Sequence, residues 1–247
     1  MKTNLFKNKK VRIVLSIALA AVIITAGTFA WFSGTAGQGS AVTMGALEVN
    51  VTLDDGIDDD YYYEPGETAD LKYTIDNIHP TDNYKAAMIK ADFKAGTVVI
   101  SSDDYGKPLA APYTMNIDPA TVDVIGEIKT FIDPITYEVA AWYVDRTTDI
   151  YYLLLDPGMA AVADLEVNFV GKTMGNAYQN AQFDFAGTFP YTQVMEEAML
   201  DVLGLDVMNL DPIDEDGIVL YEFSLYSADG GMTRNDYMQL LYDAMAK

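Results

Sequence analysis

Cysteine is absent from the 247-residue chain, and histidine occurs once, as His79. The lack of cysteine excludes disulfides, thiolate nucleophiles and cysteine-ligated zinc sites. His79 lies in the turn-like sequence Asn77-Ile78-His79-Pro80, and no His-Glu-x-x-His zinc-peptidase motif is present. A Ser-His-Asp triad would have to use this single histidine. We interpret His79 as a surface-loop residue and predict no catalytic residues, no resident cofactor and no enzyme activity.

Basic residues are also scarce, with 15 Lys and Arg against 37 Asp and Glu. Five of the basic residues and none of the acidic ones fall within residues 1–30. Taking these five from the fifteen leaves ten basic residues against 37 acidic ones, a net charge of about −27 for the remainder. Such a surface repels phosphate backbones, so we predict that nucleic acid is not a partner.

The N-terminal residues have the three parts of a secretory signal peptide. A basic stretch from Lys2 to Arg12 precedes an apolar run from Ile13 to Thr25. Cleavage between Ala30 and Trp31 would place Thr28 and Ala30 at the −3 and −1 positions. The alternative is an uncleaved anchor helix over residues 11–32, which is long enough to cross a bilayer. No later apolar run has a similar length, so membrane contact is predicted only through the uncleaved signal segment.

Alternating apolar and polar residues predict many short strands in the rest of the chain. Residues 47–53 and 71–75 alternate most clearly. Further strands are predicted at 87–93, 97–101, 137–144, 149–155, 163–171, 181–188 and 218–226. Helical spacing predicts helices at 191–203 and 233–246, and the second follows a Thr233–Asp236 capping box. Residues 102–135 contain four prolines and are predicted to be irregular, with a short helix at 120–131. The pattern predicts a mainly β fold, a sandwich or barrel with a few short helices, in one domain over residues 43–247.

Calcium is the best small-ligand candidate in an acidic chain of this kind. Asp214 and Asp216, followed by Gly217, supply half of an Asp-x-Asp-Gly loop. An EF-hand register puts Pro212 and Phe223 at ligand positions, and neither side chain can coordinate a metal. The acidic run at 54–60 has oxygen ligands but no fixed pattern. The alternative at each place is a solvated acidic loop.

Three segments together resemble the TasA/camelysin family of exported bacterial matrix-fibre proteins. The first segment is the signal junction at 26–33, Ala-Gly-Thr-Phe-Ala-Trp-Phe-Ser, with the strand entry Met-Gly-Ala-Leu-Glu-Val at 44–49. The second is Glu-Pro-Gly-Glu at 64–67, which leads to Ile-Asp-Asn at 75–77. The third is Gly-Asn-Ala-Tyr-Gln-Asn-Ala-Gln-Phe at 175–183, with Thr192-Gln193 near the family's Val-Gln. Gly34 and Asn180 depart from the family pattern, and residues 204–247 extend beyond it.

The resemblance implies a jelly-roll sandwich, cleavage by a SipW-type signal peptidase, and export to the extracellular matrix or the cell surface of a bacterium. It also implies head-to-tail polymerisation of identical subunits by donor-strand complementation. The freed segment 31–42 would then act as a donor strand and linker, with Trp31, Phe32, Ser33, Gly34 and Thr35 as the strand. Camelysin has been described as a peptidase, but no zinc-ligand set is visible here, so that activity does not carry over.

The residues themselves make strand donation plausible. Trp31 and Phe32 on a Gly/Ser-rich tether would bury apolar area in a neighbour while the backbone pairs with a sheet edge. Two buried aromatics contribute roughly 4–6 kcal/mol before ordering costs. The alternative is that both aromatics fold back onto their own sheet or merely mark the end of the signal. A second interpretation of the whole chain is a monomeric secreted binding module or peptidase-like hydrolase.

Overall fold

The computed structural model describes residues 33–37, 47–55, 63–78, 85–93, 96–118, 120–185, 187–223 and 231–246. The predicted signal peptide, Ala30, Trp31, Phe32 and His79 lie outside the described residues. Within them, no helix combines the length and the apolar character needed to cross a membrane.

The larger of two facing sheets has seven antiparallel strands. Its path runs β1 (Ser33–Gly37), β13 (Thr188–Gln193), β4 (Ala87–Ala91), β10 (Ile150–Leu155), β9 (Val139–Asp145) and β14 (Leu210–Pro212). The short strand β8 (Phe131–Ile132) also pairs with β9. Strands β4, β9 and β10 are mostly buried, as expected for a sheet that is covered on both faces.

The second sheet has four antiparallel strands in the order β2 (Val49–Asp55), β3 (Thr68–Asn77), β11 (Ala160–Phe169) and β7 (Val122–Ile128). Buried and exposed residues alternate along β3 and β11. This is the period-2 pattern of a sheet with one face in the core and one in water. The sequence pattern at 47–53 and 71–75 is therefore confirmed.

The main hydrophobic core lies between these two sheets. Trp142, Ile89 and Leu153 from the seven-stranded sheet belong to the same buried cluster as Val51 and Ile75 from the four-stranded sheet. Each large apolar side chain that is fully buried contributes about 1.5–3 kcal/mol relative to exposure. The prediction of a mainly β sandwich with antiparallel sheets and few short helices is confirmed.

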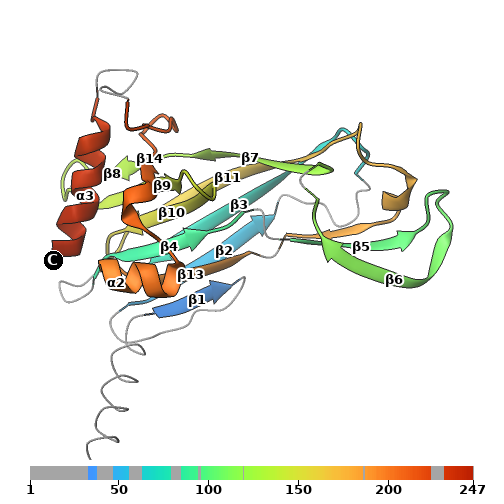
Figure 1. Ribbon diagram of the computed structural model, residues 1–247, viewed down its shortest axis with the longest axis horizontal. Helices are drawn as coiled ribbons and strands as arrows, with labels where there is room; N and C mark the ends of the chain where they lie inside the picture. Colours follow the sequence, from blue (N-terminus) through green and yellow to red (C-terminus); the bar gives the residue numbers. More distant parts are fainter. Residues whose placement is uncertain are drawn as a thin grey trace, which may run out of the picture.

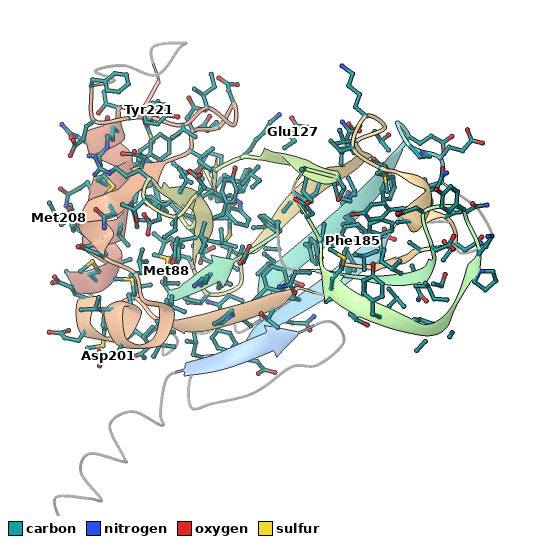
Figure 2. All side chains as sticks on the ribbon, turned by 45° about the vertical axis from the view of Figure 1, so that its right-hand side comes forward. Met88, Glu127, Phe185, Asp201, Met208 and Tyr221 are labelled. Atoms are coloured by element: carbon teal, nitrogen blue, oxygen red, sulfur yellow. The ribbon has the colours of Figure 1, made fainter. Side chains whose placement is uncertain are left out.

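A second core covers the outer face of the seven-stranded sheet. Met88, Tyr143 and Leu154 point away from the first core and pack with Met199 and Leu241. These last two residues belong to a C-terminal layer of helical segments, which comprises α2 (Glu196–Ala198), η3 (Met199–Leu203), η4 (Val207–Asn209) and α3 (Arg234–Ala246). Figure 1 shows α2 and α3 together at one end of the molecule, and Figure 2 shows Met88 near this end and Phe185 near the other.

A small sheet projects from the opposite end of the sandwich. Its strands are β12 (Gln182–Asp184), β5 (Thr97–Ser102) and β6 (Pro108–Asn116), in that order, and the short η2 (Asn176–Tyr178) lies beside β5. Figure 1 shows the β5–β6 hairpin as an arm at the end away from α3.

Three sequence predictions were wrong. Residues 102–135 are not irregular, because they form β6, β7 and β8, and strand β7 replaces the helix predicted at 120–131. The helix predicted from 191 begins only at Glu196, because residues 188–193 pair in a sheet. The strand predicted at 218–226 is reduced to one bridge between Ile213 and Val219, and residues 224–230 lie outside the described residues. In each case the local sequence pattern was ambiguous, and pairing with distant strands determined the secondary structure of the segment.

Candidate functional site

One edge of the seven-stranded sheet is closed by the segment that follows the predicted cleavage site. Strand β1 pairs antiparallel with β13 of its own chain, from Ser33 opposite Thr192 to Gly37 opposite Thr188. Figure 1 shows β1 alongside the sandwich at this edge. Among the described residues, β1 has no sheet partner other than β13. The edge of β13 is thus the place where this N-terminal strand docks.

Strand β1 holds this position through backbone pairing with β13. Its sequence is Ser-Gly-Thr-Ala-Gly, which contains neither a charged nor a large apolar residue. Glycine in a strand weakens it, because glycine has no side chain to pack and loses more conformational entropy on ordering. Five residues of this kind form a strand that pairs through ladder hydrogen bonds and leaves at little cost in packing.

Strand β13, in contrast, is anchored in the core. Phe189 and Tyr191 are 1% and 0% exposed. The Phe189 ring centroid lies 5.2 Å from that of Tyr73 and 6.3 Å from that of Phe93. Burial raises the pKa of the Tyr191 hydroxyl, which is the effect expected when the charged phenolate loses its hydration. Strand β13 therefore presents a fixed edge to whichever strand pairs with it.

The neighbouring strand β4 pairs with only half of β13. The β4 ladder covers Tyr191 to Gln193, whereas β1 runs along the strand from Thr188 to Thr192. Pro190 lies opposite Thr35 and has no N–H to donate, and such a proline is tolerated at the edge of a sheet. No residue of β13 is charged, so its edge does not repel an incoming strand from an acidic protein.

The predicted donor-strand residues divide between described and undescribed parts of the chain. Ser33, Gly34 and Thr35 lie in β1, and Trp31 and Phe32 lie outside the described residues. The sequence reasoning missed β13, the strand that pairs with β1, because it assigned residues from 191 onward to a helix. The alternation of Phe189 and Tyr191 with Pro190 and Thr192 was the available signal.

The two calcium candidates, Asp214 and Asp216, lie in a tight loop in which one Asp214 carboxylate oxygen accepts backbone hydrogen bonds. Asp214 is 3% exposed, and its Oδ1 accepts the backbone N–H groups of Asp216 and Ile218 at 3.0 and 2.8 Å. Its Oδ2 is buried without a hydrogen-bond partner. Asp216 is exposed, and Gly217 adopts φ +83°, a value that closes the turn and favours glycine. This loop has the geometry of an Asx turn.

Among the residues that the structure describes, no three His, Cys, Asp or Glu side chains gather closely enough to hold a metal ion. The ligand set that a zinc peptidase needs is therefore not assembled from these residues. A groove of about 620 Å³ on the outer face of the four-stranded sheet is lined mainly by charged side chains: Asp54, Asp70, Lys72, Glu127, Asp164 and Glu166. This acidic face is open to solvent and contains no histidine.

A protein-family model described as camelysin metallo-endopeptidase matches residues 5–198 of the chain. No curated protein and no solved structure matches the chain. The matched range includes β1, β13 and all other strands of the two facing sheets except β14, and it ends at Ala198, the last residue of α2. The C-terminal layer from η3 to α3 lies beyond it.

Proposed function

The chain belongs to the camelysin metallo-endopeptidase family, and from this premise we propose that its mature form is a secreted structural subunit of extracellular or cell-surface fibres. Subunits join head to tail, because the N-terminal strand of one copy pairs with the β13 edge of the next. Head-to-tail joints of this kind do not close on themselves and therefore propagate as filaments.

The observation that supports this proposal best is the pairing of β1 with β13. The docked strand begins three residues after Ala30, so cleavage at the predicted site would leave Trp31 and Phe32 as the tip of this strand. In the described chain the strand occupies its own β13 edge. The same five backbone pairs can form with the strand of a second copy, because β1 contributes no large side chain that fixes it to its own core.

Exchange of the strand is favoured once the tip is available to a neighbour. Nanomolar joints require about 12 kcal/mol, which exceeds the roughly 4–6 kcal/mol that two buried aromatics contribute. The ladder between β1 and β13 adds to this only where the β13 edge of the receiving copy is not already paired with its own β1, because exchange otherwise replaces equal pairs. We infer that signal cleavage both releases the protein and makes its N-terminal strand able to join subunits.

The peptidase activity in the family's name is not part of the proposal. The chain holds one histidine and no cysteine, and the described residues do not assemble a metal-ligand set. We derive no catalytic step from them. Incubation of the mature protein with an unfolded protein substrate, with and without added Zn²⁺, is expected to give no cleavage above buffer, and zinc-dependent cleavage would contradict this part of the proposal.

Truncation tests the structural role. Mature protein that starts at Trp31 is expected to form filaments in negative-stain electron micrographs, and protein that starts at Ala41 is expected to stay monomeric. A mature form that remains monodisperse at high concentration, at neutral and acidic pH and with or without calcium, would contradict the proposal.

A further inference from the structure

Strand β6 is an open edge on the arm that projects from the sandwich. Among the described residues it pairs with β5 alone. Its nine residues, Pro108–Asn116, are exposed almost throughout. Figure 1 shows β6 at the end of the molecule away from α3 and beyond the facing sheets.

The apolar face of the small sheet continues onto β6 and is left uncovered there. Val98 and Ile100 of β5 are 1% and 2% exposed, whereas their cross-strand neighbours Met115 and Tyr113 are 37% and 51% exposed. Cross-strand neighbours in an antiparallel pair lie on the same face. The apolar row that is buried on β5 is therefore exposed to solvent on β6. An additional strand paired with β6 would cover these side chains.

Charge sets β6 apart from the edge strands β2, β7 and β12 among the described residues. Strand β6 contains no charged residue. The edge strand β1 is also uncharged, whereas the edge strands β2, β7 and β12 carry the exposed carboxylates Asp54, Glu127 and Asp184. Two copies of a chain with a net charge of −22 repel each other at those edges and can approach at β6.

The hydrogen-bond pattern shows which backbone groups of β6 face outward. The N–H of Ile117 donates to the carbonyl of Gly96 at 3.2 Å, so the backbone N–H and C=O groups of residue 117 point toward β5. Because successive residues of a strand point their backbone groups to opposite sides, 113 and 115 also face β5, and 112, 114 and 116 face outward. Pro112 has no N–H, so the outward donors of this stretch are those of Thr114 and Asn116.

From these observations we propose that β6 is a self-association edge, where the β6 of a second copy pairs antiparallel across a two-fold axis centred on Thr114. In this register the two Thr114 residues exchange both backbone hydrogen bonds, and each Asn116 N–H donates to the Pro112 carbonyl of the other copy. That gives about four hydrogen bonds between the strands. Centring the axis on Asn116 would place the Thr114 N–H opposite residue 118, beyond the strand, and centring it on Pro112 would extend the pair into the stretch where the β5–β6 register shifts.

The same register also pairs the uncovered side chains. Tyr113 of one copy lies opposite Met115 of the other, in a non-hydrogen-bonded pair whose Cα atoms are about 4.5 Å apart. A methionine sulfur beside an aromatic ring is a favourable contact. The two residues that run off the edge of each sheet thus cover those of the other copy.

A single joint of this size is small beside a standard protein interface, which buries about 1,600 Å². Its effect grows when identical joints repeat along two adjacent filaments, because each joint holds the next at high effective concentration. In this respect the inference rests on the proposed function: β6 would bundle filaments laterally, and the β1–β13 contact would elongate them.

Cysteine scanning tests the register in a chain that has no cysteine of its own. In the proposed pair, the two Thr114 Cα atoms are about 5.5 Å apart, within disulfide range. The two Asn116 Cα atoms are about 14 Å apart, far outside it. Under mild oxidation at high protein concentration, Thr114→Cys is expected to give a disulfide-linked dimer and Asn116→Cys at least tenfold less. Equal cross-linking of the two variants, or none of Thr114→Cys, would overturn the proposal.

A backbone variant tests the role in filaments. Thr114→Pro removes an outward N–H and leaves the β5 ladder intact, because residue 114 faces away from β5, and Thr114→Val is the matched control. Electron micrographs are expected to show single filaments for Thr114→Pro and bundles for Thr114→Val. Bundles of Thr114→Pro would overturn the bundling role. If no variant forms filaments, the proposed function fails, and the cysteine experiment still decides whether β6 pairs.

Discussion

A buried ion pair connects the C-terminal helix to the sheet edge. Arg234, at the start of α3, holds the Asp211 carboxylate of β14 through an Nε–Oδ1 contact of 3.1 Å, and Asp211 is 1% exposed. The guanidinium also donates to the Leu210 carbonyl at 2.8 Å. A buried carboxylate that loses its partner is left without compensation in a low-dielectric site.

Removal of Arg234 is therefore expected to destabilise the fold. Arg234→Met should lower the free energy of unfolding by about 3 kcal/mol in urea titrations. Lys72→Met is the control, because Lys72 contacts Asp164 at 3.9 Å on the exposed sheet face, and surface pairs are worth at most about 1 kcal/mol. Equal effects of the two substitutions would show that the Arg234–Asp211 pair is no more than a surface contact.

Buried tyrosines predict a loss of stability in alkali. Burial, which disfavours the phenolate, raises the pKa of Tyr152 and of Tyr237 to about 12 from an ordinary value of 10. A group whose pKa is raised by folding stabilises the fold fully below its unfolded pKa and loses that contribution as the pH rises through its folded pKa. The free energy of unfolding should thus fall between pH 10 and 12, and Tyr237→Phe should make this fall shallower. A stability that is constant up to pH 12 would contradict the burial of these hydroxyls.

The C-terminal layer of helical segments covers the outer face of the seven-stranded sheet. Leu241 of α3 is 0% exposed in the second core, whereas Tyr242 next to it is 41% exposed. Leu241→Ala should cost about 2–5 kcal/mol in the free energy of unfolding, and Tyr242→Ala should cost below about 1 kcal/mol. Thermal or urea unfolding followed by circular dichroism measures both, and a small effect at Leu241 would mean that α3 does not pack on the sheet.

Individual elements were predictable from the sequence to the extent that their local pattern was unambiguous. The capping box at the start of α3 is confirmed, because Thr233 N and Asp236 N both bond to the other residue's side chain. Strand β7 was missed because its alternation is interrupted at Gly126. This glycine lies opposite Leu165 of β11, and a Cβ at position 126 would overlap a Leu165 methyl group. Only the neighbouring strand shows why a small residue is needed there.

Of the two strands in the candidate site, the sequence predicted only the N-terminal one, for a similar reason. The donor segment stands out in sequence, because small residues follow two aromatics after a signal peptide. The β13 edge does not, since Thr188–Gln193 acquires its place in the sheet from the strands it meets: β4 on one side and β1 on the other. Pairing between residues about 155 positions apart leaves no local trace in the chain.

At the scale of the whole molecule, charge opposes assembly. On the outer face of the four-stranded sheet, Asp70 lies directly opposite Glu166 and Asp164 lies opposite Glu127, so like charges face each other within one subunit. Direct opposition of like charges is destabilising, and a filament would bring many such faces near one another.

Conditions that reduce this charge are expected to promote fibre growth. Lowering the pH toward the carboxylate range or adding millimolar Ca²⁺ should shorten the lag in light-scattering assays by severalfold, whereas the same ionic strength of NaCl should have a smaller effect than Ca²⁺. Growth that responds to neither acid nor divalent cations would contradict the view that acidic repulsion limits assembly.

The central claim is that the N-terminal strand of one subunit occupies the β13 edge of another, and mixing two single-cysteine variants tests it most directly. Gly37 and Thr188 are cross-strand partners, and Thr188 is exposed. When mature Gly37→Cys and Thr188→Cys are mixed under assembly conditions and oxidised, the account predicts a disulfide between the two different chains, and little when either variant is oxidised alone. Filaments that grow from the mixture without this cross-link would contradict the account, because the strand would then remain on its own sheet.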